Sequence, residues 1–215
     1  HVDLYKGMGN TLFIAVCTTV LCSYFTALTA YALSCYTFKG NNLLFIVMLV
    51  FMMVPSQLSL LGFYDLCNAL GLIDSYIPLI IPAIASSGTV FFLRQYLMSV
   101  LPKAVLEAPR IDGASEITIF HKIVLPIISP GVATMAIGCF IGSWNSYLIP
   151  LVLINDQDLF TLPLMIASLN AVQDISTNIG ATYLAVAISV IPIIIVFCFC
   201  SRYIISSISA GSVKE

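Results

Sequence analysis

Long stretches without a charged side chain make up most of this chain and alternate with short polar segments. A helix needs about 20 largely apolar residues to cross a bilayer. Each stretch is long enough or nearly so, and the third is completed by Arg94, whose long side chain can snorkel from the end of the helix. The uncharged stretches cover residues 11–38, 40–64, 75–93, 123–155 and 175–201. The pattern predicts an all-α membrane protein, a polytopic helical bundle with five transmembrane helices at about 11–38, 42–63, 76–98, 126–154 and 178–203.

Composition supports a membrane protein and excludes several other classes. The chain is 60% hydrophobic and only 8% charged, its mean hydropathy is +1.06, and soluble domains carry about 25% charged residues. A net charge of −2 without a basic patch gives no reason to expect nucleic acid as a partner. The seven cysteines form no Cys-x-x-Cys pair. We therefore expect them to be buried small hydrophobic residues, and we predict no metal site and no disulfide framework.

Basic side chains gather on one side of the membrane if the five spans alternate in direction. That side receives Lys39, Arg94, Lys103, Arg110, Lys122, Arg202 and Lys214, and the other side has only Lys6. The positive-inside rule then predicts a cytoplasmic turn at 39–42, a cytoplasmic loop at 99–125 and a cytoplasmic tail at 206–215. The first residue would lie outside, and a sixth span before His1 would explain how it reaches that side. We therefore expect a further transmembrane helix to precede this segment.

The most strongly charged stretch lies between the third and fourth predicted spans, and helix signals flank Gly113. Pro102 suits the first turn of a helix. Glu107 is spaced for ion pairs with Lys103 and Arg110. Gly113 suits the left-handed residue that ends such a helix.

A second short helix is predicted directly after Gly113. Ser115 can cap its start, and Ile117, Phe120 and Val124 fall on one face. A charged helix–glycine–helix hairpin between two membrane spans must lie in water or against another protein. It is therefore predicted to be a docking element.

The residues of this hairpin resemble the EAA loop of bacterial ABC-importer permeases. The family pattern is Glu-Ala-Ala, three residues, Gly, nine residues, Ile, any residue, Leu-Pro. The chain has Glu107, Ala108, Gly113, Ile123, Leu125 and Pro126 at those spacings. It departs at Pro109, where the family usually has Ala. Pro109 removes the bond to the Val105 carbonyl and is expected to bend the first helix.

Other segments extend the resemblance from Asn10 to Lys214. They are Arg94-Gln95-Tyr96, the run from Arg110 to Glu116, Leu162-Pro163 and the tail from Ser209 to Lys214. Together they are most similar to the carbohydrate branch, the maltose-type subunits. The resemblance implies a single ABC-importer transmembrane domain over 1–215. It also implies a bacterial plasma (inner) membrane location, multi-pass, with the C-terminus in the cytoplasm.

The resemblance further implies partners and a coupling role. The partners are a second permease subunit, an ATPase subunit dimer and an extracytoplasmic solute-binding protein, besides the lipid bilayer. ATP and Mg would be bound by the ATPase subunits, so this chain is expected to carry no cofactor and no catalytic residue. The residues expected to couple to the ATPase are Glu107, Ala108, Arg110, Asp112, Gly113, Ala114, Ser115, Ile117 and Phe120.

Uncharged polar side chains are the only candidates for contact with a transported solute. No predicted span carries an ionisable group in its middle, which favours an uncharged solute over ion coupling. Aromatic faces with amide and hydroxyl groups suit a sugar. The candidates are Gln57 near Pro55, and Trp144, Asn145 and Tyr147. Residues 142–145 resemble a Gly-Ser-Trp-Asn stretch that is common in the carbohydrate branch. The competing interpretation is an interfacial aromatic belt and helix packing, the role also expected for residues 86–89 and for the Gly138–Gly142 spacing.

Alternatives to a sugar permease remain open from the residues alone. They are an ABC permease for an amino acid or another small polar solute, an ion-coupled secondary transporter, and a structural membrane protein. His121 is expected at the surface of the hairpin, and no histidine lies inside a predicted span to serve a hydrolytic enzyme.

Overall fold

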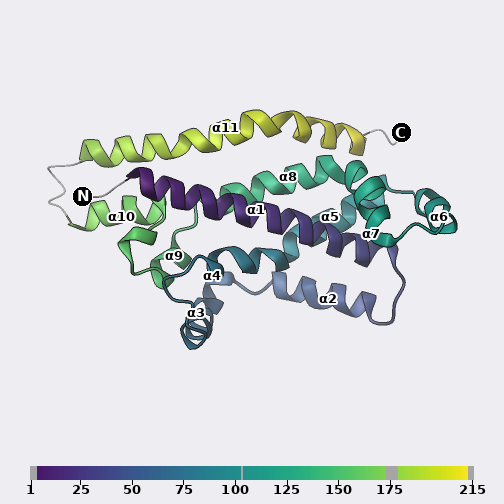
Figure 1. Ribbon diagram of the computed structural model, residues 1–215, viewed down its shortest axis with the longest axis horizontal. Coiled ribbons are helices and arrows are strands. Elements are labelled where there is room, and N and C mark those ends of the chain that lie inside the picture. The colour runs from purple at the N-terminus through teal and green to yellow at the C-terminus, as the bar shows by residue number, and fades with distance from the viewer. Residues whose placement is uncertain (1–3, 103, 173–178, 213–215) are drawn as a thin grey trace. The chain divides into compact units, whose positions relative to one another are not determined.

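The computed structural model describes residues 4–102, 104–172 and 179–212, with the backbone alone at 56, 169–172, 179, 181 and 200–212. Throughout these residues the regular elements are helices. In chain order they are α1 (Leu4–Cys35), α2 (Asn41–Met52), η1 (Ser56–Ser59), α3 (Leu60–Ala69), α4 (Ile77–Ile80), η2 (Ile81–Ala85), α5 (Ser87–Val100), α6 (Ala104–Ile111), α7 (Glu116–Ile119), η3 (Phe120–Val124), α8 (Leu125–Trp144), α9 (Leu148–Leu153), η4 (Gln157–Leu159), α10 (Leu162–Val172) and α11 (Ile179–Ser212). Figure 1 shows α11 as one long helix and α6 and α7 as a short pair joined by a turn.

The predicted class, an all-α membrane bundle, is confirmed. The number of spans agrees with the predicted five to within one. Among the described residues, four helical segments are long and apolar enough to cross a membrane: Leu4–Cys35, Ile77–Val100, Glu116–Trp144 and Thr182–Phe199. The pair Asn41–Met52 and Gln57–Ala69 makes a fifth if the two helices form one span bent by 88°.

The second and fourth spans differ from the straight helices that hydropathy predicts. The second breaks at Pro55, which lacks an N–H and disfavours helical backbone in the residue before it. The fourth was predicted to reach residue 154, but α8 ends at Trp144 and α9 begins at Leu148. Asn145 Nδ2 donates to the Ile141 carbonyl at 2.9 Å, a local bond of the kind that competes with a helical ladder.

The end of the chain is more regular than predicted. Residues 206–212 of the predicted tail continue α11 as helix, and residues 213–215 lie outside the described part. The expectation that the cysteines are buried holds for Cys22 and Cys67, but Cys198 on α11 is exposed. Cys200 lies outside the described side chains.

The chain divides into two compact units, which are described separately. Unit 1 comprises residues 1–19, 56–83 and 137–199, and unit 2 comprises residues 20–55, 84–136 and 200–215. The core of unit 2 joins the second half of α1 to α5, α6, α7 and α8. Its fully buried side chains are Ala27, Ala30, Leu93, Ile119, Phe120, Val124 and Ile128.

Glycine allows a close helix approach in unit 2, although not where the sequence predicted one. A methyl group on Gly131 of α8 would lie 2.5 Å from Cδ1 of Tyr96 on α5. The described chain shows no tight packing at Gly138 and Gly142, where the sequence predicted it, because beyond its neighbouring residues and the backbone of its own helix a methyl group at either position would meet no atom within 4 Å.

In unit 1, Asp74 organises the segment that follows α9. Its backbone N–H donates to the Leu153 carbonyl at 2.9 Å. Its carboxylate accepts hydrogen bonds from the backbone N–H groups of Asp156 and Asn155. These bonds, with that from Asp156 contributing most, hold the pKa of the carboxyl below its usual value. Lys6 also forms an ion pair with Asp158 at 2.7 Å. The loop is therefore an ordered structure built on polar backbone contacts.

A coupling hairpin and a candidate solute groove

The hairpin predicted between the third and fourth spans is formed by α6 and α7. The N–H of Ala114 donates to the Pro109 carbonyl at 3.0 Å, and the N–H of Gly113 donates to the Arg110 carbonyl at 3.1 Å. These two bonds form a Schellman cap, which requires a left-handed residue at Gly113. Its φ is 75°, as the sequence predicted.

The start of α7 is also capped as predicted. Ser115 Oγ accepts the backbone N–H of Thr118 at 3.3 Å. Two details of α6 differ from the prediction. The helix begins at Ala104, so Pro102 precedes it instead of forming its first turn, and it continues through Pro109 to Ile111. The bend expected at Pro109 stays a prediction.

The ion pairing within the hairpin differs from the helical spacing rule. Among the described residues, Arg110 pairs with Glu116 and not with Glu107, and Lys103 lies outside them. Arg110 Nε lies 2.8 Å from Glu116 Oε1, and Nη2 lies 3.4 Å from Oε2. The turn at Gly113 brings the end of α6 close to the start of α7. Arg110 therefore pairs with Glu116 across the turn instead of with Glu107 along α6. The hydrogen bond from Arg110 lowers the pKa of the Glu116 carboxyl, which precedes the membrane-spanning part of α8, to about 2.

The predicted apolar face of α7 is only partly correct. Phe120 and Val124 are fully buried together with Ile119, whereas Ile117 is 68% exposed. Ile117 is two residues before Ile119 and so points to the opposite side of the helix. A π-turn over residues 120–124 then leads into α8 just before Pro126. In a regular α-helix the ring of Pro126 would clash with the carbonyl four residues earlier, and the wider turn avoids that clash.

Burial separates the predicted coupling residues into a surface group and an anchor. The exposed group comprises Glu107, Ala108, Arg110, Asp112, Gly113, Ser115 and Ile117, while Ala114 and Glu116 are half-buried. Phe120 is fully buried, with ring centroids of Tyr24 and Tyr31 at 6.1 and 5.7 Å. Phe120 therefore packs the hairpin on α1 and is not part of its exposed surface, and its predicted role in coupling stays a prediction. Ile111, which the prediction omitted, is 85% exposed.

Tyrosines on α1 receive the hairpin, and the sequence interpretation missed them. Tyr24 and Tyr31 are seven residues apart and share a helix face. The hydroxyl of Tyr31 donates to Glu116 Oε2 at 2.7 Å. The hydroxyl of Tyr24 lies 3.2 Å from Nε2 of His121, whose Nδ1 lies 2.8 Å from the Ile117 carbonyl. Because a carbonyl only accepts, Nδ1 carries the proton. The seven-residue spacing was the available signal.

Three of the predicted solute contacts meet in unit 1. Gln57, Asn145 and Tyr147 line a groove of about 1100 Å³. Asn145 and Tyr147 come from the break between α8 and α9, and Gln57 comes from η1 after the break at Pro55. Helix breaks thus place all three side chains, and the lining residues include no charged side chain.

Trp144 does not belong to this groove. It is 1% exposed, its Nε1 donates to the Ser189 carbonyl at 3.1 Å, and its ring is stacked on Phe140 at 5.7 Å. Trp144 therefore does not line this groove in the described structure, and its place on a substrate path stays a prediction. Its indole joins α8 to α11 in the core of unit 1.

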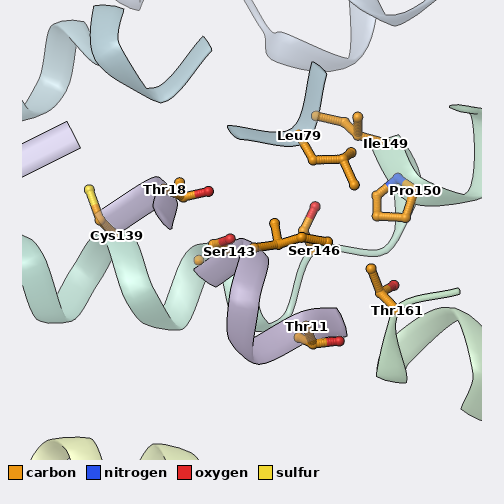
Figure 2. Close-up of a pocket in the computed structure, with 11 residues that line it drawn as sticks. Thr11, Thr18, Leu79, Cys139, Ser143, Ser146, Ile149, Pro150 and Thr161 are labelled. Atoms are coloured by element: carbon orange, nitrogen blue, oxygen red, sulfur yellow. The ribbon is translucent and has the colours of Figure 1, made fainter. Parts of the chain in front are cut away.

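A smaller cavity of about 180 Å³ adjoins the groove and shares four lining residues with it: Leu79, Gly142, Ser146 and Ile149. Figure 2 shows its hydroxyl-bearing residues, which are Thr11, Thr18, Ser143, Ser146 and Thr161. Thr11 is internally satisfied, because its Oγ1 donates to the Gly7 carbonyl and accepts the Leu162 N–H. The buried hydroxyls of Thr18 and Thr161 have no partner among the described residues. The cavity can therefore hold water or a hydroxyl-bearing solute.

Comparison with known proteins identifies the family to which the chain belongs. The sequence profile of the family described as "Binding-protein-dependent transport system inner membrane component" matches residues 20–209. The chain is 38% identical over 210 residues to the arabinooligosaccharides transport system permease protein AraQ of Halalkalibacterium halodurans, covering 98% of this chain and 74% of that protein. It is 33% identical to the diacetylchitobiose uptake system permease protein NgcG of Streptomyces coelicolor, covering 99% of this chain and 70% of that one.

A solved structure shares the fold. A chain in the crystal structure of a bacterial ABC transporter involved in the import of the acidic polysaccharide alginate superposes with a TM-score of 0.82 at 24% identity. The match covers 95% of this chain and 76% of that one. With most of its length matched by one family and by named permeases, this multi-pass protein, which is not itself an enzyme, belongs to the binding-protein-dependent transport system inner membrane components, the permease subunits of ABC importers.

Proposed function

We propose that this chain is one of two membrane subunits of an ATP-driven importer for an uncharged sugar or oligosaccharide. Its partners are a second permease, a dimer of ATPase subunits in the cytoplasm and an extracytoplasmic solute-binding protein. The C-terminus and the α6–α7 hairpin face the cytoplasm, in accord with the distribution of Lys and Arg. The relatives named for arabinooligosaccharides and diacetylchitobiose support a sugar as the solute.

The observation that carries the coupling role is apolar exposure on an otherwise polar hairpin. Ile111 and Ile117 are 85% and 68% exposed, beside the exposed charges of Glu107 and Asp112. In the proposed arrangement the ATPase covers these two apolar side chains. ATP-driven closure of the ATPase dimer would move the hairpin, and the hairpin would shift the spans between inward-open and outward-open states.

The groove supports the uncharged character of the solute. An anionic solute would call for a cationic side chain, and the lining residues have none. Gln57 and Asn145 offer amide donors and acceptors, and Tyr147 offers an aromatic face and a hydroxyl. These groups match the hydroxyls and C–H faces of a sugar ring.

Purification of the assembled complex tests the coupling role. A tag on this chain should co-purify the ATPase, and proteoliposomes should take up labelled arabinotriose or maltotriose only with ATP and the binding protein. Ile111→Ala and Ile117→Ala each remove apolar surface worth about 1–2 kcal/mol if the partner buries it, so each should weaken ATPase retention about tenfold. Ile117→Leu is the conservative control. An ATPase that remains fully bound in the double Ala variant would refute this role for the hairpin.

A second set of variants tests the groove. Asn145→Ala and Tyr147→Ala should reduce sugar uptake while leaving ATPase association unchanged. Asn68→Ala, exposed on α3 outside the groove, is the matched control. Equal uptake by all three variants and the wild type would exclude solute contact in this groove.

A further inference from the structure

One carboxylate in unit 2 connects three separate helices. Glu116 opens α7, Arg110 lies near the end of α6, and Tyr31 lies on α1. Oε1 accepts from Arg110 Nε at 2.8 Å, and Oε2 accepts from the Tyr31 hydroxyl at 2.7 Å and from Arg110 Nη2 at 3.4 Å. Both oxygens are therefore occupied by donors from other elements.

The two donors to the Glu116 carboxylate lie in different surroundings. Tyr31 is 2% exposed and packs on the fully buried Phe120. Arg110 is exposed, and its guanidinium carbon lies 5.5 Å from the centre of the Tyr36 ring. The carboxylate thus lies at the edge of the core, with a buried donor from α1 on one side and a surface cation from α6 on the other.

Two other contacts between the hairpin and α1 are of another kind. Phe120 packs on Tyr24 and Tyr31 through ring faces and edges, and His121 meets the Tyr24 hydroxyl in an exposed bond. Apolar contacts tolerate sliding, whereas a short bond to a charged carboxylate fixes both distance and direction. In the described part of the chain, the bonds through Glu116 link Arg110 on the exposed surface of α6 to Tyr31 on α1.

We propose that Tyr31, Glu116 and Arg110 form a clamp that transmits movement of the hairpin to α1, with Glu116 as a positioning residue for ATP-driven transport. The inference rests on the proposed function, and it adds a route: force applied at α6 passes through Arg110 and Glu116 to Tyr31 and so to α1. Phe120 keeps the hairpin seated while the clamp fixes its direction.

Tyr31→Phe is the sharpest variant, because it removes one hydroxyl and keeps the ring that packs on Phe120. Tyr24→Phe is the matched control, since it makes the same change on the same helix face but breaks the bond to His121. Glu116→Gln is a second probe, which keeps the shape of the side chain and removes its charge. The measurement uses the complete transporter in proteoliposomes, with arabinotriose as solute, and reports sugar molecules taken up per ATP hydrolysed together with Tm and ATPase retention.

The clamp predicts that Tyr31→Phe and Glu116→Gln each lower the uptake per ATP at least about fivefold, while the ATPase stays bound. The double variant should lose little more than either single one, because both remove the same link. Tyr24→Phe should keep the wild-type ratio. If Tyr31→Phe lowers Tm substantially, Glu116→Gln decides, because its half-exposed side chain adds little to the core.

Two results would overturn the clamp alone: a wild-type ratio in Tyr31→Phe and Glu116→Gln, or an equal fall in Tyr24→Phe. A wild-type complex that lacks ATP-dependent uptake would overturn the proposed function and the clamp with it.

Discussion

Gly113 provides the most direct test of how the hairpin is built. Two effects could make a substitution there harmful: the volume of the new side chain and the backbone conformation. A methyl group on Gly113 would meet no atom of this chain within 4 Å, so volume contributes nothing within the chain. The φ of 75° is the whole constraint. The harm should therefore follow backbone preference and not size.

The magnitude follows from the left-handed conformation. An L-residue other than Asn or Asp pays roughly 1–2 kcal/mol there, and a β-branched residue pays more. A cost in that range changes the population of the closed turn by about 5- to 30-fold. Gly113→Ala should therefore open the hairpin measurably, Gly113→Val should open it further, and Gly113→Asn should stay close to the wild type.

Amide hydrogen exchange over residues 104–119 measures this opening directly. We expect protection to fall about 5- to 30-fold in Gly113→Ala. Uptake per ATP should fall least in Gly113→Asn, more in Gly113→Ala and most in Gly113→Val. The reasoning would fail if Asn, which is larger than Ala, were the more damaging of the two. It would also fail if Gly113→Val exchanged and transported as the wild type does.

Three further predictions concern the two units. Trp144→Phe removes the indole hydrogen bond to the Ser189 carbonyl, so we expect a loss of about 0.5–1.5 kcal/mol, seen as a lower Tm of the purified complex, with sugar specificity unchanged. Gly131→Ala over-packs the helix contact and should cost about 1–3 kcal/mol, whereas Gly138→Ala, with open space around it, should be neutral in the same melt. Asp74 has a lowered pKa, so its support of the loop after α9 is present above about pH 4 and is lost as the pH falls through that lowered pKa. Asp74→Asn should accelerate exchange in that loop at pH 7, and unchanged protection would contradict the assignment.

The architecture could be predicted because it depends on local chemistry. Spans follow from the cost of leaving backbone and charge unsatisfied in lipid, which hydropathy reports directly. The turn at Gly113 and the cap at Ser115 were also predictable, since each depends on one residue and its immediate neighbours.

Partners in space were not predictable in the same way. The spacing rule favoured Glu107 for Arg110, but the turn brought Glu116 closer. Trp144 and Phe120 were predicted as site residues, and the structure shows that each is buried in a hydrophobic core. The sequence did not reveal this burial, because an aromatic residue suits a sugar, an interface or a helix contact equally well.

The sequence by itself determined the class of the protein, the approximate spans and the cap that closes the hairpin, because each of these depends on residues near one another in the chain. Only the tertiary structure decided that Tyr31 meets Glu116, that Asn145 and Tyr147 share a groove with Gln57, and that Trp144 does not. These contacts join residues far apart in sequence. They depend on where helices break and which faces turn inward, and a one-dimensional pattern does not record either.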